Sequence, residues 1–112
     1  MQKNNTQQQI NTNTTICGVI GDPIHHSASP SIHNSIYSHY NLNYAYHAFH
    51  VTKSNLQNAI NSFKTLGIKG INVTIPHKES ILEHCTTLDE LAKKIGAVNT
   101  IVFDKEHIHG YN

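Results

Sequence analysis

Charged residues are scarce in this sequence. Basic residues number 8 and acidic residues 7 among 112, so only 13% of the chain is charged, against about 25% in a typical soluble domain. The net charge is +1, and the lysines are scattered and not interleaved with aromatic residues. This composition argues against a nucleic-acid partner and against attraction to an anionic membrane surface. The 38% hydrophobic content still permits the core of one domain.

Long apolar segments and paired cysteines are missing as well. No segment approaches the roughly 20 apolar residues of a membrane-spanning helix, and residues 1–15 lack the apolar centre of a secretory signal. These first 15 residues are almost wholly Gln, Asn, Thr and Lys, so we expect a disordered polar tail. Cys17 and Cys85 belong to no C-x-x-C pair. We therefore expect two unpaired thiols in a cytoplasmic protein.

Residues 16–112 alternate between strand-like and helix-like apolar patterns. Period-2 patterns predict strands over 16–20, 44–51, 71–75, 98–103 and 108–111. Helical spacing predicts helices over 29–40, 52–66, 76–85 and 87–95. This alternation indicates one α/β domain, a three-layer α/β/α arrangement with a mostly parallel sheet. The last strand follows a tight turn at 104–107 and is expected to pair antiparallel at or near an edge.

Local signals predict where the helices begin and end. Ser29 is expected to cap the first helix, with Pro30 at its first position. The buried stripe of that helix is expected to comprise Ile32, Ile36, Tyr37 and Tyr40. Residues 87–90 match a capping box for the last helix. Gly67 and Gly96 are placed to end helices in the left-handed conformation.

The richest chemistry lies in residues 71–78. Asn72 and Thr74 share one face of the expected strand, and Pro76 is expected to end the strand and open a helix that holds Lys78 in its first turn. An amide, a hydroxyl and an ammonium would then converge at the carboxyl end of a strand, where open α/β sheets bind ligands. This set suits proton transfer on a small, oxygen-rich molecule. The alternative for Lys78 is a solvated lysine paired with Glu79.

Two further polar groups need an explanation. Ser27 and Ser29 alternate just before a helix, where two hydroxyls and the helix amides would suit a carboxylate; Ser29 can equally be a simple cap, whereas Ser27 has no evident structural duty. Asn99 is flanked by Val98 and Ile101 and is hard to explain as a surface residue. Backbone groups or a bound polyol could satisfy Asn72, Thr74 and Asn99.

The ten histidines do not match a metal-binding pattern. None forms H-E-x-x-H, and no Cys/His set has zinc spacing. The pairs His47-x-x-His50 and His107-x-His109 are expected on strands or edges without a nearby carboxylate pattern. We therefore expect no metal site and place most histidines at the surface, with His26 bracing the serine loop.

Three motifs together resemble the shikimate dehydrogenase family, in its order and spacing. They are Gly21-Asp22-Pro23-Ile24-His25-His26-Ser27-Ala28-Ser29-Pro30 with Ile32-His33-Asn34, then Asn72-Val73-Thr74-Ile75-Pro76-His77-Lys78, then Gly96-Ala97-Val98-Asn99-Thr100. The resemblance covers residues 16–112 and only the amino-terminal, substrate-binding domain of that family. It implies NADP-dependent, reversible reduction of 3-dehydroshikimate to shikimate, a step of aromatic biosynthesis.

The resemblance also implies roles for individual residues. Ser27 and Ser29 would hold the substrate carboxylate, and Asn72 would give a supporting or direct contact. Contacts to the ring hydroxyls would come from Thr74, Lys78 and Asn99. Lys78 matches the catalytic lysine, which in the family works with an aspartate in an Asn-Thr-Asp-Gly motif.

The family's catalytic aspartate and cofactor domain are not found in these 112 residues. Asn112 matches the first residue of the Asn-Thr-Asp-Gly motif, and the sequence has no G-x-G-x-x-G turn, so the NADP-binding Rossmann domain is absent from it. We expect a fragment that binds shikimate without oxidising it. The alternatives are a quinate-preferring relative, a stand-alone binding module and a His-rich metal carrier; a homodimer is left open.

Overall fold

The computed structural model describes residues 9–112, and residues 1–8 of the expected tail lie outside the described part. Six strands form a single sheet: β1 Thr15–Gly21, β2 Tyr44–His50, β3 Gly70–Val73, β4 Thr87–Leu88, β5 Thr100–Phe103 and β6 Ile108–Tyr111. The helices are α1 Ser29–His39, α2 Leu56–Leu66 and α3 Glu90–Ile95, with short 3-10 turns η1 Lys53–Asn55 and η2 Ser80–His84. Ordered contacts begin before β1, where the Thr14 hydroxyl donates to Asn43 Oδ1 at 2.7 Å.

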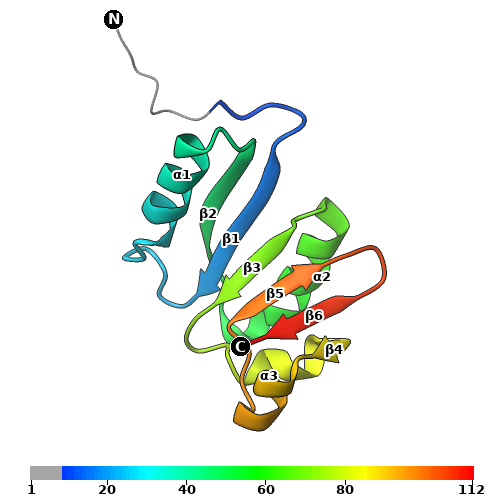
Figure 1. Ribbon diagram of the computed structural model, residues 1–112. Coiled ribbons are helices and arrows are strands. Elements are labelled where there is room, and N and C mark those ends of the chain that lie inside the picture. Colours follow the sequence, from blue (N-terminus) through cyan, green and yellow to red (C-terminus); the bar gives the residue numbers. More distant parts are fainter. Residues whose placement is uncertain (1–8) are drawn as a thin grey trace, which may run out of the picture.

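The sheet has the strand order β2-β1-β3-β5-β6-β4 and is mostly parallel, as predicted (Figure 1). β1 pairs in parallel with β2 and β3, and β4 with β6, whereas β5 runs antiparallel to both of its neighbours. The prediction that the last strand pairs antiparallel near an edge is confirmed for β6. The edge itself is β4, which was missed because Thr87 was expected to begin a helix.

The two longer helices cover opposite faces of the sheet, which confirms the three-layer prediction. On β1, Ile16 and Ile20 belong to the large cluster that contains the α2 residues Ile60 and Phe63. Val19, on the other face of β1, packs in a small cluster with partly buried Tyr37 of α1. Period 2 along the strand therefore divides the core in two.

The predicted buried stripe of α1 is wrong at three of its four positions. Ile32, Ile36 and Tyr40 are 56%, 46% and 67% exposed, and only Tyr37 packs against the small cluster. The reason is that α1 packs on the edge strand β2 through another face, on which His33 stacks on Tyr46 and Asn34 hydrogen-bonds to the Tyr46 backbone. On the opposite face of the sheet, α2 buries Leu56, Ile60 and Phe63. No helix within residues 9–112 is long and apolar enough to cross a bilayer.

The helix caps also differ from the prediction. Ala28, not Ser29, occupies the N-cap position of α1, and Pro30 lies in its first turn. Asp89, not Thr87, caps α3, and its Oδ1 accepts the Ala92 N–H at 2.8 Å. The carboxylate meets the backbone donor directly, so Thr87 is free to join β4. Gly67 and Gly96 adopt positive φ of 78° and 75°, which confirms their predicted role.

The segment after β3 does not form the expected helix. Residues 78–79 lie in a turn, and helical structure begins only with η2, so Lys78 precedes the helix instead of lying inside it. His77 is fully buried, with its Nε2 2.6 Å from the Val51 carbonyl oxygen. This contact directs the His77 ring into the core, which corrects the expectation of a surface histidine here. The Asp22–Pro23 and Ile75–Pro76 peptides are cis.

Candidate functional site

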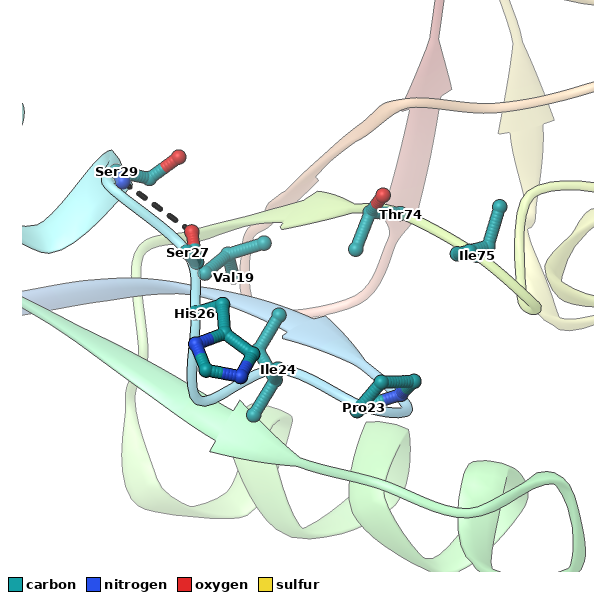
Figure 2. Close-up of a pocket in the computed structure, with 8 residues that line it drawn as sticks. All are labelled: Val19, Pro23, Ile24, His26, Ser27, Ser29, Thr74 and Ile75. Atoms are coloured by element: carbon teal, nitrogen blue, oxygen red, sulfur yellow. Dashed lines mark hydrogen bonds between the residues drawn. The ribbon is translucent and has the colours of Figure 1, made fainter.

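A cavity of about 350 Å³ opens where β1 and β3 end. Its lining is Val19, Pro23, Ile24, His26, Ser27, Ser29, Thr74 and Ile75. Figure 2 shows Ser27 on the loop before α1 and Ser29 at the start of α1, with Thr74 and Ile75 across from them on the segment after β3. Three of the predicted site residues, Ser27, Ser29 and Thr74, therefore line one cavity. It lies at the carboxyl ends of parallel strands, the usual ligand position in this class of sheet.

The serine loop is folded by its own hydroxyl. The Ser29 N–H donates to Ser27 Oγ at 3.2 Å (Figure 2), and the Ser27 N–H donates to the Ile24 carbonyl at 3.0 Å. Ser27 thus has the structural duty that the sequence did not reveal, since it satisfies a backbone donor at the start of α1. Its hydroxyl proton is still available to a ligand. His26 lines the cavity beside the serines, and its ring contacts His25.

Backbone hydrogen bonds hold the two sides of the cavity together. The Thr74 N–H donates to the Ile20 carbonyl and the Asp22 N–H to the Ile75 carbonyl, each at 3.0 Å. Gly21 lies between these bonds, and a Cβ there would come within 2.5 Å of Thr74 Cγ2. The absence of a side chain at Gly21 is what lets Thr74 approach the end of β1.

Asn72 and Asn99 lie outside the cavity lining, in one hydrogen-bonded chain of side chains. The Tyr46 hydroxyl donates to Asn72 Oδ1 at 2.6 Å, and Asn72 Nδ2 donates to Thr100 Oγ1 at 3.2 Å. The Thr100 hydroxyl then donates to Asn99 Oδ1 at 3.0 Å, and Asn99 Nδ2 makes a long contact of 3.5 Å with Asn112 Oδ1. Neighbouring side chains satisfy most of the hydrogen-bonding groups of the two amides. The first role of Asn72 and Asn99 is therefore to hold this chain of side chains in place.

Tyr46 is a site residue that the sequence did not single out. Burial raises the pKa of its hydroxyl to about 12, partly offset by a hydrogen bond with Ser29. Tyr46 thus joins the serine loop to the amide chain, as a neutral donor at physiological pH. Its backbone is held by Asn34, which accepts the Tyr46 N–H and donates to its carbonyl, both at 2.9 Å. The only available signal was that Asn34 belongs to the first motif.

Lys78 has a fixed backbone and a free ammonium. Its carbonyl accepts the Val98 N–H at 2.8 Å, and the adjacent Asn99 carbonyl accepts the Val73 N–H at 2.8 Å. These bonds bring Lys78 and Asn99 close to the carboxyl end of β3. Lys78 is exposed, and within residues 9–112 its ammonium pairs with neither Glu79 nor any other carboxylate. It does not line the cavity.

The arrangement favours a compact ligand with an anionic end and several hydroxyls. Serine hydroxyls and the first turn of α1 donate at one side, and Thr74 provides a hydroxyl across the cavity. None of the lining side chains is a carboxylate, so an anion would meet no like charge there. The ammonium of Lys78 supplies a cation and a proton donor nearby.

The family model for the shikimate dehydrogenase substrate binding domain matches residues 19–101. The chain belongs to this family. A curated relative, the NADP(+) shikimate dehydrogenase of Methanosphaera stadtmanae, is 53% identical over 103 residues, which are 92% of this chain and 36% of that relative. The chain therefore spans little more than a third of that dehydrogenase.

Solved structures agree with this family assignment. The shikimate 5-dehydrogenase of Listeria monocytogenes, solved in complex with shikimate and NAD, has a TM-score of 0.90 and 34% identity, over 94% of this chain and 36% of that one. The 5-ketofructose reductase of a Gluconobacter strain has a TM-score of 0.88 and 26% identity, over 91% and 37%. Because one fold carries both names, the substrate has to be argued from the side chains.

Proposed function

We propose that this chain binds shikimate and 3-dehydroshikimate as the substrate-binding part of an NADP-dependent shikimate dehydrogenase. The observation that carries the proposal is the convergence of Ser27, Ser29 and Thr74 on one cavity. An unpaired Lys78 lies at the same end of the sheet, beyond the carboxyl end of β3. The substrate named for the shikimate dehydrogenase relatives has one carboxylate and several hydroxyls, which matches this set of donors.

The proposed contacts follow from what each side chain still has to offer. Ser27 and Ser29 hold the carboxylate, because both stand at the positive end of α1. Ser27 keeps a hydroxyl proton, and Ser29 can turn its hydroxyl from Tyr46 to the ligand. Thr74 and Asn99 contact ring hydroxyls, while Asn72 acts mainly by supporting the chain of side chains from Tyr46 to Thr100.

Lys78 is the proposed catalytic residue. Reduction of a ketone leaves negative charge on the carbonyl oxygen, and an ammonium stabilises that charge and delivers the proton that makes the hydroxyl. In the reverse direction the neutral amine takes the same proton. Because Lys78 has no carboxylate partner within the described residues, its proton can go to the substrate oxygen.

NADP is part of the proposal as the source of hydride when it is bound. The 112 residues contain no Gly-rich phosphate turn, so no residue of this chain is assigned to the dinucleotide. The unpaired thiols of Cys17 and Cys85 fit a reducing compartment, which supports a cytoplasmic location within the same proposal.

Calorimetric titration of the chain with shikimate tests the proposal. We expect saturable binding that weakens about 10- to 100-fold in Lys78→Ala, because a charged hydrogen bond contributes roughly 1.5–3 kcal/mol. Lys69→Ala is the matched control, since Lys69 is an exposed lysine just before β3, at the opposite end from Thr74. Equal affinities of the wild type and Lys78→Ala would refute the role of Lys78.

A second series tests the carboxylate site and the substrate. Ser27→Ala should weaken shikimate binding, while the exposed Ser62→Ala on α2 should not. Titration with quinate, which carries an additional hydroxyl beside the carboxylate, should give weaker binding; tighter binding of quinate would reassign the substrate. A folded chain that binds neither compound would overturn the proposal that this domain holds the ligand by itself.

A further inference from the structure

The turn between β5 and β6 brings together three side chains that can ligate a metal. Asp104, His107 and His109 each offer one ligand atom, and these atoms all lie within 4.8 Å of one another. His109 Nε2 is 2.8 Å from Asp104 Oδ2, and His107 Nδ1 is 3.6 Å from Asp104 Oδ1. The side chains are 53%, 49% and 26% exposed in the order Asp104, His107 and His109, so an ion can reach them from solvent.

Contacts outside this group already orient two of the three side chains. Asp104 Oδ1 accepts the backbone N–H groups of Glu106 and His107 at 3.0 and 2.8 Å, which fixes the carboxylate and leaves Oδ2 toward His109. On the other side of its ring, His109 Nδ1 lies 2.6 Å from Thr87 Oγ1 on β4. With Nδ1 held by Thr87, Nε2 is the nitrogen presented to Asp104. Metal-binding histidines are commonly held in this way by a hydrogen bond at the second ring nitrogen.

We propose that Asp104, His107 and His109 form a binding site for a divalent transition-metal ion. Two imidazoles and one carboxylate suit Zn²⁺, Ni²⁺ or Cu²⁺ and do not suit Mg²⁺ or Ca²⁺, which prefer all-oxygen sites. Donors on a tetrahedral zinc ion with bonds of about 2.1 Å lie roughly 3.4 Å apart. The distances of 2.8 and 3.6 Å involve the two different carboxylate oxygens of Asp104, and the three ligand atoms lie within 4.8 Å of one another. The side chains must therefore draw together to close on an ion, which their exposure to solvent permits.

The metal site is independent of the cavity. Gly70, at the start of β3, pairs with Val102 near the end of β5, so the β5–β6 turn lies at the end of the sheet opposite to Thr74. Figure 1 shows this orange-to-red turn away from the ends of β1 and β3. A bound ion would join the turn to β6, and through Thr87 to the edge strand β4. The site therefore acts on the stability of this edge and not on the proposed substrate.

The sequence offered part of this signal. The pair His107-x-His109 has no carboxylate next to it in the sequence, but Asp104 precedes it by three residues. A tight turn folds that carboxylate back onto the pair, an arrangement that the linear spacings of zinc motifs do not include.

Calorimetric titration of the chain with Zn²⁺ tests the site. We expect one tight Zn²⁺ site whose affinity falls at least tenfold in His107→Ala and in His109→Ala. Excess Mg²⁺ should leave the Zn²⁺ affinity of the unaltered chain unchanged. Asp104→Asn keeps an oxygen for the turn N–H groups and should also weaken Zn²⁺ binding. His39→Ala is the matched control, because His39 is an exposed histidine at the end of α1. Unchanged affinity in the two histidine variants, or no saturable binding, would overturn the proposal.

A measurement on the unaltered chain guards against variants that fail to fold. Addition of paramagnetic Ni²⁺ should broaden the amide resonances of residues 104–109 and of Thr87 before any others. Broadening centred instead on the adjacent His25 and His26 rings would show that the protein binds metal elsewhere and would contradict this site.

Discussion

The two faces of the sheet differ sharply in what they bury. On the α2 face, 14 buried side chains from β1, β3, β5, β6, α2, α3 and the connecting segments form one continuous cluster within the described residues. On the α1 face the corresponding cluster comprises only Val19, Ile24 and Tyr46. That face also carries the amide of Asn72 and the lining of the cavity. Stability is concentrated on one side of the sheet and ligand chemistry on the other.

This division has a simple physical origin. A polar side chain on a strand is tolerated only where other polar groups or a ligand satisfy it, so it cannot share a face with a continuous apolar cluster. Because side chains alternate along β3, Ile71 and Val73 enter the α2 cluster while Asn72 faces Tyr46. Substitutions on the two faces should therefore affect different properties of the protein.

The largest effect is expected for Ile60→Ala on α2. Ile60 is 1% exposed in the centre of the large cluster, so the change leaves a cavity and should lower the free energy of unfolding by about 2–5 kcal/mol. Urea denaturation followed by circular dichroism measures this. A loss below about 1 kcal/mol would mean that the cluster does not dominate stability.

Gly21→Ala, on the α1 face, should affect both stability and ligand binding. The new Cβ would meet Thr74 Cγ2 at 2.5 Å and Ile24 Cδ1 at 3.0 Å, and overpacking of this kind costs about 1–3 kcal/mol. Because Thr74 lines the cavity, its displacement should weaken shikimate binding in calorimetry as well. Unchanged stability together with unchanged affinity would contradict the close approach of β1 and Thr74.

Tyr46→Phe isolates the polar network. The variant keeps the ring and leaves Asn72 Oδ1 without its donor, so we expect a loss of about 0.5–1.5 kcal/mol by the same denaturation measurement. No change would indicate that water replaces the hydroxyl at no cost.

The stability of the chain at alkaline pH gives a second measure of the Tyr46 hydroxyl. Burial raises the pKa of Tyr46 to about 12 in the folded chain, whereas a tyrosine in the unfolded chain ionises near pH 10. The stabilisation is therefore complete below about pH 10 and is lost as the pH rises toward 12. Absorbance of tyrosinate should show late ionisation of Tyr46 that disappears in Tyr46→Phe, while the late ionisation of Tyr37 remains.

The smallest effect is expected for Ile36→Ala on α1. Ile36 is 46% exposed, and surface substitutions usually change stability by less than about 0.5 kcal/mol. The same substitution in α1 and α2 thus compares the two faces directly. A loss at Ile36 equal to that at Ile60 would show that something covers α1 in solution.

The sequence predicted the fold class, the parallel sheet and the final antiparallel pairing because period-2 and helical patterns are local. It failed where the outcome depended on distant partners. Ile32, Ile36 and Tyr40 form a helical stripe, but α1 meets β2 through His33 and Asn34 instead, which contact Tyr46. Thr87 matched a capping box, but it pairs with His109 of β6 as part of β4, and Asp89 is the residue that caps α3.

For the candidate site, the motifs singled out Ser27, Ser29 and Thr74, and the structure places all three in the lining of one cavity. They did not reveal Tyr46, because nothing local to β2 indicates that its hydroxyl meets Asn72, which is 26 residues away in the sequence. They also gave no sign that Ser27 folds its own loop. Contacts between distant segments, and the shape of a loop, are decided by tertiary packing.

The free side chain and tied backbone of Lys78 have a consequence for the entropy of ligand capture. The main chain here is already ordered by the bond from Val98 to the Lys78 carbonyl, so a ligand has only the four-carbon side chain left to immobilise. That costs about 0.5–1.5 kcal/mol, whereas ordering the backbone of even two loop residues would add about 2–4 kcal/mol. The Lys78 side chain can therefore be immobilised by a ligand with only a small loss of conformational entropy.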